Sequence, residues 1–316
     1  MPVAKVYSNA CLHHIIKMEE VMEFNDITLA DKEWLSKRFR EDNKRACEFC
    51  FASTYLWKKV YPLKVADTCG CAILKYIFDD DIYYAFPAGA GDKKKALAKI
   101  MLYEQTEGNL VKISGILEEE KEMVLSWYPG RFIIEPDRDR SDYIYNAKDL
   151  MELAGRKYHG KRNHIARFKD NSSWNYEKLS SANVAECIQM NHIWKKKRVD
   201  KWDDLMQEEY DVVKEALIHF EELGLTGGVL KSDGQVIAFT LGEPLSDDTF
   251  VVHFEKAFPE IQGAYPMINQ QFVIAECQGF QYVNREEDTG DEGLRKAKLS
   301  YHPAILLDKY TAIQKR

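Results

Sequence analysis

The sequence contains no apolar run long enough to cross a lipid bilayer. Its longest apolar stretches, such as 236–241 and 304–307, are far shorter than the ~20 residues that a spanning helix needs. The first 20 residues carry charges where a secretory signal needs an unbroken apolar core. We therefore expect no membrane insertion and a cytoplasmic location.

The sequence also lacks an excess of positive charge. Its 44 Lys and Arg residues face 51 Asp and Glu residues, which gives a formal net charge of -7. This balance disfavours a protein that coats nucleic acid by bulk charge, although it allows a local basic patch. A hydrophobic content of 45% over 316 residues excludes a disordered chain and is enough for two domains.

The cysteine count gives no sign of a disulfide framework. Seven cysteines without a secretory signal indicate reduced thiols. The pairs Cys47/Cys50 and Cys69/Cys71 raise the question of a four-thiolate zinc site. However, the first pair lies in a predicted helix over 44–57 and the second in a predicted strand, so buried free thiols are the favoured interpretation. We predict no metal.

The first half has mixed α and β patterns. The spacing of Thr28 and Asp31 is that of a capping box, and it predicts a helix that starts near Leu29. Further helices are predicted over 93–107 and 118–127, and strands over 71–76, 81–86, 111–116 and 131–135. The charged segment 137–141 is a candidate boundary. We predict an N-terminal domain over 1–150 and a C-terminal domain over 151–316.

The second half begins with helices and then turns to strands. Periodicity predicts helices over 182–197 and 203–223, with Gly224 as the C-terminal cap of the second. A hairpin over 228–242 and a third strand over 249–256 follow. A helix over 267–278 comes next and carries Pro266 in its first turn.

The loop before that last helix is a candidate anion site. Small residues at Gly263 and Ala264 would let a pyrophosphate approach the amides of a helix N-terminus. A tight strand-to-helix turn is the alternative. Residues 87–91 precede the helix over 93–107 in a similar way and form a second candidate loop, which makes the first half a candidate degenerate copy of the C-terminal unit. The predicted cofactor-binding set comprises Phe254, Lys256, Gln262, Gly263, Ala264, Tyr265 and Pro266.

One long motif carries a family resemblance. The run YVNREEDTGDEGLRKAKLSYHP over 282–303 resembles the C-terminal domain of bacterial phosphatidylglycerol lysyltransferases and their soluble relatives, which are similar to Fem-type aminoacyl-transferases. The blocks 161–163 with Phe168, and 263–266 with Asn269, look like further matching blocks. The resemblance covers 155–309 well and 22–149 more weakly.

This resemblance implies an α/β fold of two GNAT-like acyltransferase domains in tandem. The order of elements in the second half is also that of the GNAT superfamily of acyl-CoA N-acyltransferases. The sequence departs from the lysyltransferases because it lacks their long membrane-embedded N-terminal region, so we do not expect a lipid acceptor at a bilayer.

Acyl transfer to an amine needs a base for the amine and a donor for the developing oxyanion. Glu255, at the end of the third strand, is the candidate base. Asn284 closes the next strand, where GNAT-like sheets splay apart and admit the pantetheine arm, so the resemblance implies that it bonds that arm or orients the acyl carbonyl. Tyr301 lies on a predicted helix over 294–301 whose inward face is Leu294, Ala297 and Tyr301. It roughly matches the place of the phenol that protonates the leaving thiolate in many GNAT enzymes, so the resemblance implies that it is the acid. An exposed charge at Glu255 and a buried structural tyrosine at Tyr301 are the alternatives.

A dense basic segment over 156–169 stands out in an acidic chain. It is either a solvated helix face or a contact for a polyanion, namely the 3′-phosphate of CoA or a charged tRNA. The predicted substrate-binding residues are Lys161, Arg162, Arg167, Arg285 and Lys298.

Three functions remain open from the sequence. The leading one is an acyl- or aminoacyl-transferase that moves a group from a CoA thioester to an amine. The second replaces CoA with an aminoacyl-tRNA, and the net charge favours CoA slightly over this donor. The third is a binding module for CoA or another nucleotide without catalysis. The sequence leaves the acceptor and the oligomeric state open.

Overall fold

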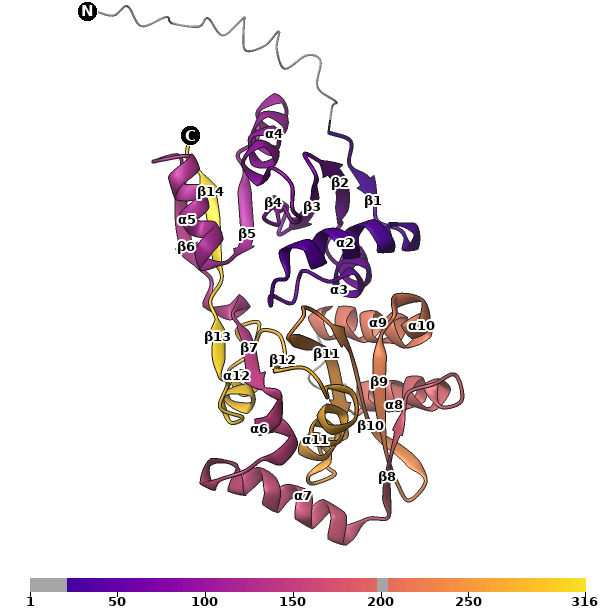
Figure 1. Ribbon diagram of the computed structural model, residues 1–316. Coiled ribbons are helices and arrows are strands. Elements are labelled where there is room, and N and C mark those ends of the chain that lie inside the picture. Colours follow the sequence, from indigo (N-terminus) through magenta and orange to yellow (C-terminus); the bar gives the residue numbers. More distant parts are fainter. Residues whose placement is uncertain (1–21, 198–203) are drawn as a thin grey trace, which may run out of the picture.

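The chain builds two seven-stranded mixed sheets, each covered by helices (Figure 1). This computed structural model describes residues 22–197 and 204–316. The first sheet has the order β1-β2-β3-β4-β5-β14-β6, and β4 and β5 are its parallel pair. Its strands are β1 (Asn25–Asp26), β2 (Lys64–Thr68), β3 (Cys71–Phe78), β4 (Asp81–Tyr84), β5 (Lys112–Ile116), β6 (Phe132–Pro136) and β14 (Tyr310–Gln314).

The second sheet repeats this plan. Its order is β13-β7-β12-β11-β10-β9-β8, and β11 and β12 are its parallel pair. Its strands are β7 (Asp142–Asn146), β8 (Trp174–Lys178), β9 (Thr226–Ser232), β10 (Gln235–Pro244), β11 (Thr249–Ala257), β12 (Tyr282–Asn284) and β13 (Ile305–Leu307).

The two halves exchange a strand. β7, the last strand of the first half, lies between β12 and β13 in the second sheet. β14, the last strand of the second half, lies between β5 and β6 in the first sheet (Figure 1). The charged segment 137–141 is the place where the chain passes from the first sheet to the second. The domain division after residue 150 stays a prediction, and the sheets themselves cross it twice.

The helices of the first half follow the sequence closely. The Thr28 amide and hydroxyl both bond the Asp31 carboxylate, at 2.8 and 2.9 Å, which confirms the capping box. The predicted helices and the hairpin are also present. The first-half helices are α2 (Lys32–Asp42), α3 (Phe51–Leu56), α4 (Lys93–Thr106), α5 (Glu118–Trp127) and α6 (Ala147–Glu152). The predicted helix over 44–57 is shorter: residues 44–50 are not helical, α3 covers Phe51–Leu56, and a 3-10 helix follows at Trp57–Lys59.

The helices of the second half surround its sheet. α11 packs on β9, β10 and β11 and against α6 and α7, whereas α8 packs on β10 and against α9. α3 contacts α9 across the two halves. These helices are α7 (His159–Asn171), α8 (Val184–Lys196), α9 (Asp204–Ile218), α10 (Phe220–Leu223), α11 (Ala264–Glu276) and α12 (Glu292–Leu299). None of the described helices is long and apolar enough to span a membrane.

A β-bulge interrupts the pairing of β10 with β11. Leu241 pairs with Phe254 but the next residue, Gly242, pairs with Val252, so His253 is the inserted residue. A bulge reverses the alternation of side chains beyond it. Phe250 packs on Phe272 of α11, and after the bulge Glu255 also faces α11, where it bonds Asn269.

The predicted helix over 294–301 is wrong in its bounds and in its buried face. α12 ends at Leu299, and Tyr301 lies in the turn beyond it. Leu294 and Ala297 are exposed, whereas Lys298 is the buried residue of the helix. The buried face differs because the Lys298 ammonium bonds backbone carbonyls inside the protein. These bonds direct the Lys298 side of α12 inward and leave Leu294 and Ala297 in solvent.

Candidate functional site

Five side chains from five separate segments meet at the α11 face of the second sheet. We call them the Arg285 cluster: Lys161 of α7, Glu255 of β11, Asn269 of α11, Arg285 just after β12, and Tyr301 just after α12. Four of these five, all except Asn269, were predicted from the sequence as site residues. The structure therefore brings together the carboxylate, the phenol and two of the cations that the sequence singled out.

An ion pair lies at the centre of this cluster. Arg285 Nη2 donates to Glu255 Oε1 at 3.0 Å, and Asn269 Nδ2 donates to Glu255 Oε2 at 3.0 Å. The two charged side chains are only 13% and 10% exposed. Arg285 Nη1 is buried and has no hydrogen-bond partner among the described residues. Because a buried unpaired donor is costly, this nitrogen is a candidate for binding a ligand oxygen.

Tyr301 forms the aromatic wall of the cluster. Lys161 Nζ lies 3.8 Å from the centroid of its ring, and the guanidinium carbon of Arg285 lies 4.8 Å from it. Burial, helped by the charge of Arg285, lowers the pKa of Lys161 to about 8. Burial also raises the pKa of Tyr301, so this phenol stays protonated at neutral pH. A fraction of Lys161 is therefore neutral near physiological pH and can accept a proton.

Lys298 supports the cluster from behind. Its ammonium donates to the carbonyl oxygens of Arg285 at 2.6 Å and Glu286 at 3.2 Å, and it also bonds that of Glu287. Burial lowers the pKa of Lys298. Lys298 thus holds the backbone that carries Arg285, which differs from the substrate contact predicted for it.

Asn284 lies apart from the Arg285 cluster. Its Nδ2 donates to the Arg45 carbonyl at 2.7 Å and to Asp142 at 2.8 Å, and its Oδ1 accepts from the Glu286 amide at 2.7 Å. The side chain is fully buried at the junction between the two halves. The structure does not bring Asn284 together with Glu255 and Tyr301.

The turn before α11 is closed on one side by α7. Gly263 has φ +88°, and an added Cβ would lie 2.3 Å from the His164 carbonyl oxygen and 2.9 Å from the Phe168 Cβ. The Ala264 amide bonds the Ile261 carbonyl at 3.1 Å. Helix packing therefore requires this glycine. Gln262 lies in the same turn, and Tyr265 and Pro266 lie in the first turn of α11.

Phe254 and Lys256, predicted to flank the donor, lie elsewhere. Phe254 is buried in the core. Lys256 pairs with Glu209 of α9 at 2.7 Å, and its Nζ lies 4.3 Å from the centroid of the Trp194 ring of α8. Since Glu255 bonds Asn269 of α11 on the other face, the structure does not bring these two residues into the Arg285 cluster.

The basic segment divides in the structure. Lys161 points to Tyr301, whereas Arg162 Nη1 donates to the Gly155 carbonyl at 2.7 Å and also bonds the Leu153 carbonyl. Arg167 and Lys169 are exposed. Of the six lysines and arginines in the segment, one therefore belongs to the cluster, one holds backbone, and the other four, which include Arg156 and Lys157, are exposed.

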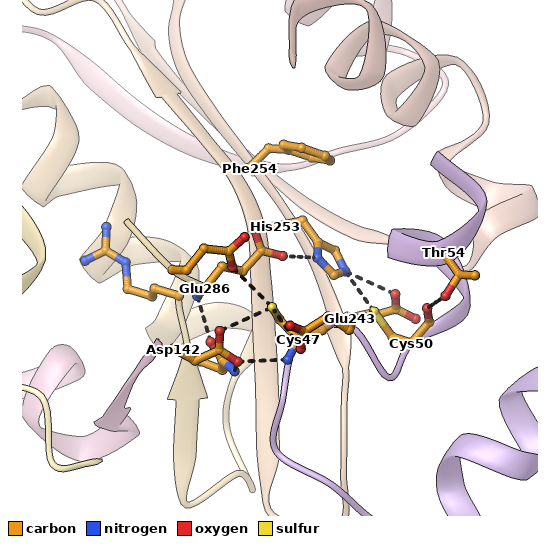
Figure 2. Close-up of polar contacts among 12 residues, drawn as sticks. Cys47, Cys50, Thr54, Asp142, Glu243, His253, Phe254 and Glu286 are labelled. Atoms are coloured by element: carbon orange, nitrogen blue, oxygen red, sulfur yellow. Dashed lines mark hydrogen bonds and ion pairs between the residues drawn. The ribbon is translucent and has the colours of Figure 1, made fainter. Parts of the chain in front are cut away.

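A second polar cluster fills the junction between the halves (Figure 2). Lys309 is buried and bonds Asp142 and Glu48, each at 2.7 Å. Burial alone would lower the pKa of Lys309, but Asp142, Cys47 and Glu48 raise it well above its usual value. The sequence reasoning missed this cluster. The Cys47/Cys50 pair was the one feature of the sequence that pointed to it.

Two groups of side chains at this junction could hold a metal. They are Cys50, Glu243 and His253, and Cys47, Asp142 and Glu287; within each, the ligand atoms lie within 4.8 Å of one another. Burial raises the pKa of Cys50 to about 12. Burial alone would lower the pKa of His253, but Cys50, Glu243 and Glu286 raise it well above its usual value. In the part of the chain that the structure describes, Cys69 and Cys71 belong to neither group, and all six cysteines are free thiols.

Two sheets of the same strand order, each with its parallel pair bridged by a helix, define a tandem GNAT-like transferase fold. Residues 39–313 match the family described as phosphatidylglycerol lysyltransferase, C-terminal. The chain belongs to this family.

Solved structures share this fold. A conserved protein of unknown function from Bacteroides thetaiotaomicron is 36% identical, with a TM-score of 0.89 over 93% of this chain and 100% of that one. The structure of L-PGS from Bacillus licheniformis is 15% identical, with a TM-score of 0.64 over 94% and 95% of the two chains. FemX is 10% identical, with a TM-score of 0.58 over 92% and 97%. The last two likenesses concern the fold alone.

A curated relative extends the comparison to sequence. The uncharacterized protein MYCGA3080 of Mycoplasmoides gallisepticum is 23% identical over 195 residues. The match covers 59% of this chain, and the chain spans 60% of the length of that relative.

Proposed function

We propose that this protein is an aminoacyltransferase that moves an aminoacyl group from an ester donor, an aminoacyl-tRNA, to an amine acceptor at the Arg285 cluster. The observation that carries the proposal is the buried Nη1 of Arg285, which has no hydrogen-bond partner among the described residues and lies beside Tyr301 and a lysine whose pKa is about 8. The family name adds support, because a lysyltransferase moves an aminoacyl group.

The chemistry assigns a separate task to each side chain. The acceptor nitrogen attacks the acyl carbon, and Lys161 in its neutral form accepts the proton that the nitrogen loses. Arg285 Nη1 donates to the carbonyl oxygen as it gains negative charge. The bond between the acyl carbon and the ribose oxygen then breaks, and that oxygen takes a proton. Tyr301, whose phenol remains protonated, is the candidate source.

Glu255 acts in this proposal as a positioning residue. Both of its oxygens already accept hydrogen bonds, from Arg285 and from Asn269, so its carboxylate fixes the guanidinium in one orientation. This assignment differs from the base role expected of Glu255 from sequence, and the two roles predict different pH profiles.

A CoA thioester is the alternative donor. It was expected to dock its pyrophosphate at Gly263, but α7 lies against the α-carbon of that residue. An ester donor needs no such approach. Arg167 and Lys169, exposed on α7, are the proposed contacts for the phosphates of a tRNA.

The test is single-turnover transfer by the full chain from aminoacyl-tRNA or from acyl-CoA to a panel of amines. We expect transfer from the tRNA ester, and a loss of at least ~10²-fold in Arg285→Lys, which lacks the second guanidinium nitrogen. Combined Arg167→Glu and Lys169→Glu should reduce the salt slope of tRNA binding by about 2. Transfer from acyl-CoA alone would overturn the donor assignment, and tight binding without transfer would favour the binding module.

A further inference from the structure

Three side chains with metal-ligand chemistry converge at the junction between the halves. His253 Nε2 lies 3.1 Å from Glu243 Oε1 and 3.8 Å from Cys50 Sγ. Figure 2 shows the imidazole between these two groups on one side and Glu286 on the other. The residues come from distant segments: Cys50 directly precedes α3, Glu243 lies near the end of β10, and His253 is the bulged residue of β11.

Two of the three separations are close to those of a tetrahedral site, and all three are within 4.8 Å. Zinc binds imidazole nitrogen and carboxylate oxygen at about 2.0 Å and thiolate sulfur at about 2.3 Å, so two ligands of one ion lie roughly 3.3 to 3.5 Å apart. The observed edges of 3.1 and 3.8 Å bracket this range. Small side-chain movements would therefore suffice to close the three ligands around an ion.

The partner of the second nitrogen of His253 is also typical of a metal site. His253 Nδ1 lies 2.7 Å from Glu286 Oε1. A metal-binding histidine almost always donates its second ring N–H to a carboxylate or carbonyl, which fixes the ring and strengthens the ligand. The His253 side chain is 2% exposed, whereas that of Glu243 is 14% exposed and leaves one edge of the site open.

Charge distinguishes this group from its neighbour. The group of Cys47, Asp142 and Glu287 already contains a cation, because Lys309 Nζ lies 2.7 Å from Asp142 and 3.6 Å from Cys47. In contrast, no lysine or arginine among the described residues pairs with the side chain of Glu243 or Glu286. His253 is the basic side chain that lies between these two carboxylates, and a divalent ion bound at its Nε2 would take the place of the proton there.

We propose that Cys50, Glu243 and His253 bind one zinc-type divalent metal ion that joins the two halves of the chain. Binding would release the proton of the Cys50 thiol, which donates to the Cys47 carbonyl at 3.3 Å, and the Nε2 proton of His253. Nδ1 keeps its proton for Glu286. The fourth position is left to water.

The site has a structural consequence for the Arg285 cluster. His253 is the inserted residue of the β11 bulge, and Glu255 follows it by two positions. Glu286, which bonds His253, directly follows Arg285. A metal at His253 would therefore fix both partners of the Glu255–Arg285 ion pair from the far side.

The experiment uses the full chain, stripped with a chelator and titrated with Co²⁺ and Zn²⁺ alone. We expect one Co²⁺ per chain, with thiolate-to-cobalt absorption in the near ultraviolet, and a rise in Tm with Zn²⁺. Cys50→Ser should lose the absorption and weaken Zn²⁺ binding by at least ~10²-fold, and Glu286→Gln should weaken it by ~10- to 100-fold.

Two control variants make the result specific to this site. Cys69→Ser removes a thiol that belongs to neither metal-ligand group, and Cys11→Ser removes one that neighbours His13 and His14 in the sequence and lies outside the described residues. Both should bind Co²⁺ as the parent chain does. The proposal is overturned if the parent chain binds no stoichiometric Co²⁺. It is also overturned if the absorption persists in Cys50→Ser or disappears in either control.

A measurement on the unaltered chain covers the case of a variant that fails to fold. Crystals of the parent protein soaked with Zn²⁺ should show anomalous scattering at the zinc edge between Cys50, Glu243 and His253. Zinc held at Cys47, Asp142 and Glu287 instead would overturn the proposal.

Discussion

Arg285 bonds Glu255 through its Nη2 at 3.0 Å, whereas its buried Nη1 has no hydrogen-bond partner in the part of the chain that the structure describes. A guanidinium offers five N–H groups in a fixed plane, so fixing one edge of it also directs the other. Asn269 bonds the second oxygen of Glu255 and completes this support. Glu255 therefore holds Arg285 so that its Nη1 is a hydrogen-bond donor with a fixed direction in a mostly buried site.

Glu255→Gln should lower the rate of transfer by about 10²-fold, because the amide cannot accept from both Arg285 and Asn269, and the guanidinium loses its fixed direction. Single-turnover kinetics measures this effect. Donor affinity should change little. If Glu255 positions Arg285, the pH profile of the variant keeps its shape; if Glu255 is the base, the rate of the variant loses its acid limb.

Lys298→Met should destabilise the fold by about 2 to 4 kcal/mol, because the carbonyls of Arg285 and Glu287 lose a buried donor. The Glu286 carbonyl keeps a second donor in the Tyr143 amide at 3.1 Å. Urea unfolding provides the measurement. Lys296→Met, an exposed position on the same helix, is the matched control and should change stability by less than ~0.5 kcal/mol.

Gly263→Ala should destabilise by more than about 3 kcal/mol, because the new Cβ would meet the His164 carbonyl at 2.3 Å in a backbone with φ +88°. Gly279→Ala is the control, since φ is +97° there but nothing lies within 4 Å, and about 1 kcal/mol is expected. Equal effects on thermal unfolding would show that α7 does not restrict Gly263.

Local patterns allowed much of the fold to be predicted. The capping box at Thr28, the helix over 118–127 and the hairpin of β9 and β10 depend on neighbouring residues, and the structure confirms them. The family motif also pointed to Arg285 and Tyr301, which meet in one cluster. These features can be predicted from local propensity and motif spacing because they do not depend on contacts with the rest of the chain.

Contacts between residues far apart in the sequence could not be predicted from local patterns. The exchange of β7 and β14 is set by pairing between segments more than 100 residues apart, as when β14 pairs with β5. The burial of Lys298 depends on carbonyls that another segment presents, so an amphipathic pattern predicted the wrong face. Cys50 and His253 are 203 residues apart, and no spacing rule connects them.

The last prediction concerns the pH dependence of the rate. Burial lowers the pKa of Lys161 to about 8, so its neutral fraction rises as the pH passes through 8. If neutral Lys161 accepts the proton of the acceptor amine, the single-turnover rate should rise with pH with a midpoint near this value. Lys161→Met should lower the rate by about 10²-fold and remove the inflection, whereas Lys296→Met, at an exposed lysine of α12 outside the Arg285 cluster, should retain both.

Stability gives an independent check that needs no substrate. The folded pKa of about 8 lies below the ordinary lysine value, so between the two values the unfolded chain binds more protons than the folded chain does. This group therefore makes the fold more stable as the pH rises from 8 towards about 10.4. The free energy of unfolding of the parent chain should increase over that window relative to that of Lys161→Met. A constant difference between the two proteins across the window would mean that the pKa of Lys161 is not lowered, and the base would have to be another group.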